Sequence, residues 1–240
     1  MSAAKHLWLG GLTALVLTVP VAAQRDHEDG RWRKAREQLV QQLRRVGIQD
    51  STTLAAMGAV PRHEFVPPEY RVAAYEDTPL PIGSDQTISQ PAVVALMTEL
   101  VRPGPGRRVL EVGTGSGYQA AVLAQAGCAV WTIEIFAGLA RDASRRLKRL
   151  GYSRVRVRHG DGYLGWPAES PFDAILVTAA ADSIPPALID QLGSGGRLVM
   201  PVGDPDTDQD LILVDKDSLG RVTTRRVIPV RFVPLLRGVR

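Results

Sequence analysis

Cysteine, aromatic residues and long apolar runs are all scarce in this sequence of 240 residues. The single cysteine, Cys128, excludes an internal disulfide and a metal site built from cysteines. The longest mostly apolar stretch has about 14 residues, whereas a membrane-spanning helix needs about 20. Net charge is only +4, with arginine and lysine scattered along the chain. Composition therefore predicts a globular protein without stable membrane association and leaves its partners open.

That apolar stretch lies at the amino terminus and has the pattern of a secretory signal peptide. Lys5 and His6 precede "LWLGGLTALVLTVP", and the small residues of "VAA" follow before Gln24. We expect residues 1–23 to be a leader and the mature protein to be periplasmic or secreted. The alternative is an uncleaved extension on a cytoplasmic protein.

The rest of the chain divides into two parts that together predict one domain, residues 24–240. Residues 31–101 show helical spacing in 31–46, 51–60 and 90–101, with prolines between these segments. From residue 107 onward, short β-branched runs alternate with helical ones. This alternation predicts an α/β fold with a mainly parallel sheet. The last two runs, 209–217 and 221–236, have no helix between them and predict an antiparallel hairpin at the sheet edge.

Three glycines at alternate positions follow the first predicted strand of the second part, in "VLEVGTGSGYQAA". A phosphate-binding loop for nucleoside triphosphates needs a lysine that is absent here. The dinucleotide fingerprint needs its third glycine where this chain has Tyr118. The remaining ligand of this class is S-adenosylmethionine. The candidate residues in this stretch are Glu111, Gly113, Thr114, Gly115, Ser116 and Gly117.

Two acidic residues at the ends of the next two strands support the same cofactor. Glu134 is placed to accept hydrogen bonds from ribose hydroxyls. Asp161 and Gly162, in "HGDGYLGW", are placed near the adenine. Because the carboxyl ends of parallel strands share one edge of the sheet, these features should form one site. We expect S-adenosylmethionine to bind there, and we expect no metal site.

Residues that the sequence lacks limit which kinds of methyl acceptor are possible. The fourth strand ends in "VTAAADS", without the aromatic side chain that would hold a flipped adenine. Cys128 lies before the second strand without an activating neighbour, so a buried apolar role is expected instead of cytosine chemistry. The aspartates at 204, 206, 208 and 210 are expected to form a solvated loop.

Several motifs resemble the protein-L-isoaspartate O-methyltransferases: "AVPRHEFVP", "YEDTPLPIGSDQTISQP", the glycine-rich stretch, "PFDAILVTAA", "QLGSGGRLVMPVG" and "VRFVPL". The resemblance runs from about residue 38 to 236 and implies a class I, Rossmann-like methyltransferase. It implies methylation of the free α-carboxyl of L-isoaspartyl residues, after which the ester closes to a succinimide and part of it reopens as normal aspartate. Isoaspartyl proteins would be its substrates, nucleic acid would not be a partner, and the protein would be a monomer.

By the same resemblance, Ser89 is the active-site residue, with Thr87, Ile88, Val233 and Pro234 around the substrate. A carboxylate is already ionised at neutral pH, so this reaction needs no general base. Ser89 could also serve as the N-cap of the following helix. Asp85 stands where the family often has glycine.

Two other functions stay open at this stage. A nucleic-acid methyltransferase is suggested by the basic residues between 141 and 149. The fold could also serve as a non-catalytic module that binds S-adenosylmethionine.

Overall fold

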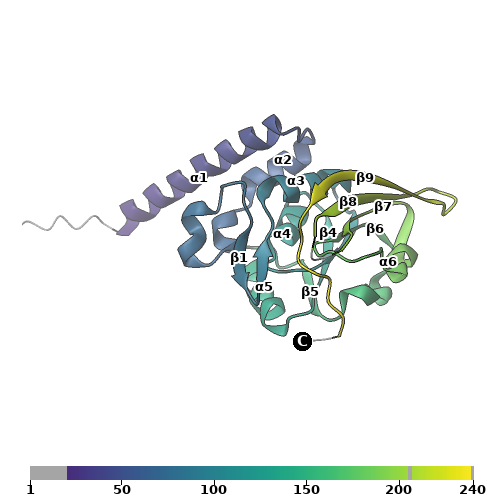
Figure 1. The fold of residues 1–240 in the computed structure, drawn as a ribbon. Coiled ribbons are helices and arrows are strands. Elements are labelled where there is room, and N and C mark those ends of the chain that lie inside the picture. Colours follow the sequence, from purple (N-terminus) through teal and green to yellow (C-terminus); the bar gives the residue numbers. More distant parts are fainter. Residues whose placement is uncertain (1–20, 205–206, 239–240) are drawn as a thin grey trace, which may run out of the picture.

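The computed structural model describes residues 21–204 and 207–238 (Figure 1). Its α-helices are α1 (Val21–Arg45), α2 (Ser51–Ala59), α3 (Pro91–Leu100), α4 (Tyr118–Gln125), α5 (Ala137–Arg149) and α6 (Pro186–Gln191). Its strands are β1 (Leu80–Gly83), β2 (Gln86–Ile88), β3 (Arg108–Val112), β4 (Ala129–Glu134), β5 (Arg156–His159), β6 (Phe172–Val177), β7 (Leu192–Val202), β8 (Gln209–Lys216) and β9 (Val222–Val230). Four short 3-10 turns are η1 (Arg62–Phe65), η2 (Pro68–Ala73), η3 (Gly162–Leu164) and η4 (Pro167–Glu169).

Seven strands form the central sheet, in the order β5-β4-β3-β6-β7-β8-β9. β3 to β7 are parallel, whereas β8 and β9 are antiparallel to their neighbours, which confirms the predicted edge hairpin. The chain builds outward from β3 to β5 and then returns to the other side of β3 with β6. At such a reversal of strand order, an open parallel sheet leaves a crevice at its carboxyl edge, where ligands bind.

Apolar side chains on both faces explain why these strands become buried. Val109 and its neighbours on one face pack against α3 and α4, through residues such as Met97 and Leu123. Leu110 and Val112 point to the opposite face and pack with α6, through Leu188. A sheet that buries both faces needs near-continuous apolar strands, which is what the sequence of β3, β4 and β6 supplies. Cys128 lies in the first of these clusters, as predicted, and burial raises the pKa of its thiol.

The amino-terminal part forms a separate helical layer with a small β1–β2 hairpin, and α1 projects beyond the body of the molecule (Figure 1). α1 begins at Val21, ten residues earlier than the periodicity predicts, and ends before Gly47, whose φ is +100°. α2 begins at Ser51, but the N-cap is Asp50, whose carboxylate accepts a hydrogen bond from the Thr53 N–H at 2.6 Å. A serine such as Ser51 is also a common N-cap, but here it is the first helical residue and the carboxylate one residue earlier provides the cap.

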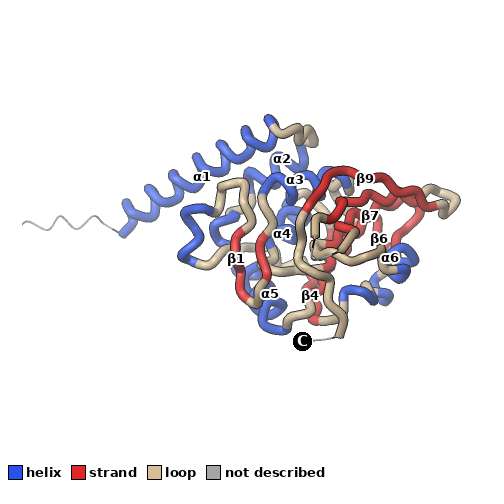
Figure 2. The backbone as a smooth tube through the Cα atoms, viewed as in Figure 1, coloured by secondary structure: helices blue, strands red, loops and turns tan. Residues whose placement is uncertain are grey.

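The carboxyl-terminal segment after β9 crosses back over the carboxyl edge of the sheet, as the long loop in Figure 2 shows. The Ala180 N–H donates to the Val233 carbonyl at 2.8 Å, and the Leu235 N–H donates to the Ala180 carbonyl at 2.7 Å. These bonds fix Val233 and Pro234 beside the end of β6. None of the helices in the described residues is both long and apolar enough to span a membrane.

Candidate active site

One cavity at the carboxyl edge of the sheet contains most of the predicted site residues. We call it the carboxyl-edge cavity. Its lining includes Thr87, Ile88, Ser89, Glu111, Gly113, Thr114, Gly115, Ser116, Glu134, Gly162, Val233 and Pro234. Residues from β2, from the β3–α4 loop, from β4 and from the carboxyl-terminal segment thus meet in one place. Gly117 and Asp161 are the two predicted site residues outside this lining.

The glycine-rich loop between β3 and α4 has a backbone that other residues would adopt only with strain. φ is +99° at Gly113, +52° at Gly115 and +88° at Gly117. A side chain on Gly113 would collide with the Thr178 hydroxyl, which donates hydrogen bonds to the Gly113 carbonyl at 2.7 Å and the Val112 carbonyl at 3.1 Å. Because its glycines have no side chains, a ligand in the cavity can approach the backbone of this loop closely.

Glu134 ends β4 beneath this loop and is 4% exposed. Its carboxylate accepts hydrogen bonds from the Gly115 N–H at 2.7 Å and the Phe136 N–H at 3.0 Å, one on each oxygen. Each oxygen keeps a further lone pair for a ligand hydroxyl. The carboxylate thus fixes the loop and offers acceptors to the cavity.

Glu111 in β3 is fully buried, and neither of its carboxyl oxygens has a hydrogen-bond partner among the described residues. Burial raises the pKa of this carboxyl to about 8, and the charge of Glu134 contributes to the increase. The polar groups of Thr132 and Ala120 oppose the shift without reaching hydrogen-bonding geometry. An unpartnered carboxyl that lines a cavity fits a ligand with a positive charge.

Ser89 lies between β2 and α3 and contributes to the opposite side of the cavity. Its hydroxyl makes no hydrogen bond with any residue of the described ranges, so it is available to a ligand. The structure does not support its possible role as a helix cap. The N-cap position of α3 is Gln90, and the carboxylate of Asp77 accepts the hydrogen bond of the Ala92 N–H at 2.8 Å.

Asp161 and Gly162 follow β5 and have different positions relative to the cavity. The Asp161 carboxylate accepts hydrogen bonds from the Tyr163 N–H at 2.9 Å and the Gly238 N–H at 3.1 Å. Gly162 lines the cavity, and a side chain there would collide with Val112. The contact of Asp161 with adenine stays a prediction.

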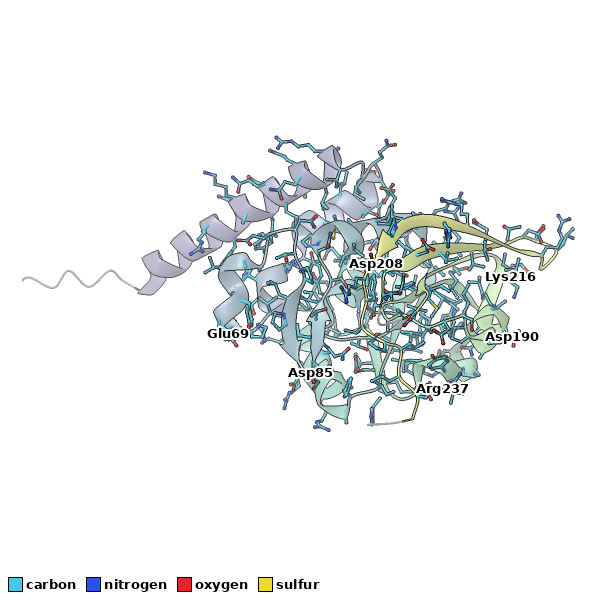
Figure 3. The ribbon with its side chains drawn as sticks, viewed as in Figure 1. Glu69, Asp85, Asp190, Asp208, Lys216 and Arg237 are labelled. Atoms are coloured by element: carbon cyan, nitrogen blue, oxygen red, sulfur yellow. The ribbon has the colours of Figure 1, made fainter. Side chains whose placement is uncertain are left out.

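Asp85 lies at the exposed tip of the β1–β2 hairpin, away from the cavity lining (Figure 3). Ser84 and Asp85 have φ values of +53° and +54°, as a two-residue turn with two left-handed positions requires. Glycine adopts this conformation without strain, which agrees with the glycine that the resemblance implies at this position.

Sequence reasoning missed several side chains of the cavity, among them Thr178, Gln119 and Phe136. Thr178 comes from "LVTAA", a stretch that we used to exclude an aromatic residue and to support the family resemblance, without giving the threonine a role. Gln119 follows the glycine-rich loop, and its amide donates to the Thr98 hydroxyl at 2.8 Å. Phe136 lies two residues after Glu134. In the described part of the chain, no group of histidine, cysteine or acidic side chains is arranged to hold a metal ion.

The strand order, the bare glycine-rich loop and the acid at the end of β4 define a class I S-adenosylmethionine-dependent methyltransferase. The buried carboxyl of Glu111 and the lone pairs of Glu134 suit this cofactor, which carries positive charge and ribose hydroxyls.

Comparison with known proteins identifies the family. The family model for protein-L-isoaspartate (D-aspartate) O-methyltransferase matches residues 34–240. The protein-L-isoaspartate O-methyltransferase of Gloeobacter violaceus is 56% identical over 197 residues, which cover 82% of this chain and 96% of the relative. The protein-L-isoaspartate O-methyltransferase of Opitutus terrae is 51% identical over 232 residues, which cover 97% of each chain.

Two solved structures support the same assignment. A protein-L-isoaspartate O-methyltransferase has a TM-score of 0.75 and 33% identity, with 85% of this chain and 66% of that chain covered. A Plasmodium falciparum protein described as a protein-L-isoaspartate O-methyltransferase, in complex with S-adenosyl-L-homocysteine, has a TM-score of 0.73 and 27% identity, with 85% of this chain and 99% of that chain covered.

The chain belongs to the protein-L-isoaspartate (D-aspartate) O-methyltransferase family. It is an S-adenosylmethionine-dependent enzyme of protein repair that methylates L-isoaspartyl residues. The resemblance read from the sequence motifs is therefore confirmed, and the nucleic-acid and non-catalytic alternatives are not supported.

Proposed function

We propose that the carboxyl-edge cavity holds both reactants of this methyl transfer, with the cofactor on the side of the glycine-rich loop and the isoaspartyl carboxylate on the side of Ser89. The observation that carries this proposal is the common lining, which joins Ser89 to Gly113, Gly115 and Glu134 in one cavity. Proximity of the two reactants is the main contribution that a protein can make to such a reaction.

Four residues would hold the cofactor. Gly113 and Gly115 let the backbone approach it, and Glu134 accepts hydrogen bonds from its ribose hydroxyls. Glu111, which is protonated in the free protein, would ionise when the sulfonium binds and would then balance its positive charge. S-adenosylmethionine supplies a methyl group on a sulfonium, so its leaving group is already activated.

On the other side of the cavity, the Ser89 hydroxyl donates a hydrogen bond to one oxygen of the acceptor carboxylate. Thr87 and Ile88 lie beside it on β2, and Val233 and Pro234 close the cavity from the carboxyl-terminal segment. The acceptor carboxylate has a reference pKa near 3.5–4, so no side chain has to remove a proton. The residues of this site position the acceptor and exclude water.

Substitution of Ser89 tests this arrangement. A hydrogen bond to a charged group contributes about 1.5–3 kcal/mol, so Ser89→Ala should lower turnover about ten- to a hundredfold. Affinity for S-adenosylmethionine, measured by calorimetry, should stay unchanged. Ser89→Thr, which keeps a hydroxyl, should retain more turnover than Ser89→Ala.

The matched control is Ser144→Ala on the exposed face of α5, which should behave as the unmodified protein. Full turnover in Ser89→Ala would contradict the proposed role of the serine. Loss of affinity for S-adenosylmethionine in that variant would indicate that Ser89 lies on the cofactor side of the cavity, which would also contradict the proposal.

We also propose that residues 1–23 direct export and are removed. Residues 1–20 lie outside the described residues, so the proposal rests on the sequence pattern. Cleavage after Ala23 would remove only the first three residues of α1. It would keep Trp32, whose ring stacks on His63 at a centroid distance of 4.4 Å and holds the helix against the body.

Amino-terminal sequencing of protein from fractionated cells tests export. We expect Gln24 as the first residue and protein outside the cytoplasm. An intact Met1 in the cytosolic fraction would overturn the proposal. We also propose that the protein is a monomer. Size-exclusion chromatography of the same material tests this oligomeric state.

A further inference from the structure

A second cavity, of about 220 Å³, lies behind the glycine-rich loop. We call it the arginine cavity. It is enclosed by η1, η2, β1 and α5, and Ser116 lines both this cavity and the carboxyl-edge cavity. Its charged lining residues are Glu64, Arg71, Asp142, Arg146 and Arg149.

Both acidic residues of the arginine cavity already have a basic partner. The Glu64 carboxylate lies 2.8 Å from the Arg149 guanidinium. The Asp142 carboxylate lies 2.5 Å from the guanidinium of Arg145, on the next turn of α5. Arg71 and Arg146 are therefore left without a carboxylate of their own.

Arg71 is only partly exposed, and its Nε atom is buried without a hydrogen-bond partner. Its side chain forms no hydrogen bond and no ion pair with any residue in 21–204 or 207–238. Partial burial of an unpaired guanidinium costs free energy, which an anion with hydrogen-bond acceptors would recover.

Arg146 is the second cation that faces this space. One of its Nη atoms donates to the Ser116 carbonyl at 2.8 Å, which leaves its other N–H groups free for a ligand. Burial lowers the pKa of Arg146, and the nearby charge of Arg149 acts in the same direction, against Asp142 and Glu64. An additional anion would relieve this unfavourable environment.

We propose that the arginine cavity binds a small oxyanion, a phosphate or a carboxylate, between the guanidinium groups of Arg71 and Arg146. A guanidinium presents parallel N–H donors that fit both kinds of oxyanion. The phosphate would be a free ion, and the carboxylate would belong to a small molecule or to an acidic side chain of the protein substrate. Because Arg146 also holds Ser116, the bound anion would stiffen the glycine-rich loop.

The test titrates the full-length protein with sodium phosphate and, separately, with sodium acetate, each against sodium chloride of equal ionic strength. Calorimetry and the melting temperature report binding. The variants are Arg71→Gln, Arg71→Lys and, as a matched control, Arg141→Gln, which removes one exposed charge from α5 outside the cavity lining.

We expect saturable binding of at least one oxyanion, weakened about tenfold or more in Arg71→Gln because a charge-assisted pair is lost. Binding should be partly kept in Arg71→Lys and unchanged in Arg141→Gln. Hydrogen exchange of the amides in 115–118 should slow when the anion binds. Phosphate binding alone would identify a free ion as the ligand, and acetate binding would point to a carboxylate.

The proposal would be overturned if neither oxyanion shifted the melting temperature beyond the chloride control. Equal binding by Arg71→Gln and Arg141→Gln would overturn it as well. All three readouts are independent of methyl transfer, so failure here leaves the assignment of the carboxyl-edge cavity untouched.

Discussion

The carboxyl of Glu111 is held inside the protein without a hydrogen-bond partner among the described residues, at the floor of the carboxyl-edge cavity. Its pKa of about 8 keeps it protonated at neutral pH in the free protein. In the unfolded chain the same group ionises near its ordinary value of 4.5. Folding therefore opposes ionisation of this residue, and stability must depend on pH because of it.

This linkage gives a prediction for Glu111→Gln. Below pH 4.5 the carboxyl is protonated in both states, so its ionisation does not lower the stability of the wild type. Between pH 4.5 and about 8, the unfolded state ionises and the native state does not. Wild-type stability should therefore fall relative to Glu111→Gln by about 1.4 kcal/mol per pH unit across this interval and level off above it.

Urea unfolding of both proteins at pH 5, 6, 7 and 8, without cofactor, measures the difference. Comparison of the two proteins at each pH cancels the contributions of the other titrating groups. A difference that stays constant from pH 5 to 8 would show that the carboxyl has an ordinary pKa and is solvated.

At the scale of elements, the amino terminus of α3 carries the substrate side of the cavity. Pro91 occupies the first turn, where its missing N–H costs nothing, and the Asp77 carboxylate binds the Ala92 N–H. Asp77 thus ties the loop before β1 to the helix that follows Ser89. The position of Ser89 depends on this contact between segments that are distant in sequence.

Asp77→Ala should remove this cap and lower stability by about 1 kcal/mol, or about 2–4 °C in melting temperature for a chain of this size. The matched control is Glu76→Ala, an exposed acid one residue earlier whose side chain forms no ion pair or hydrogen bond within the described ranges. Equal melting temperatures of the two variants would contradict the cap.

The strands and the glycine-rich loop could be predicted from sequence, because their signals are local. β3, β4 and β6 are short apolar runs, and the alternating glycines mark positions with positive φ. The cap of α3 could not, because the sequence suggested Ser89, and only the fold brings the carboxylate of Asp77 to the helix. The same holds for Thr178, since nothing in "LVTAA" shows that its hydroxyl will meet the Gly113 carbonyl.

At the scale of the whole molecule, the basic residues of α5 do not form part of the carboxyl-edge cavity. The basic residues of α5 that first suggested nucleic acid are mostly exposed, while Leu139, Ala143 and Leu147 turn inward. Helical periodicity alone explains this division, so the basic face needs no nucleic-acid partner. The chemistry is concentrated where β3, β4, the β2–α3 link and the carboxyl-terminal segment converge.

The central claim is that this one cavity transfers methyl groups to isoaspartyl carboxylates. The most direct measurement is transfer of radiolabelled methyl from S-adenosylmethionine to an isoaspartyl peptide, to its normal aspartyl twin and to an RNA. We predict base-labile label in the isoaspartyl peptide alone, about ten- to a hundredfold slower with Ser89→Ala. Equal labelling of the aspartyl twin, or labelling of the RNA, would contradict the account.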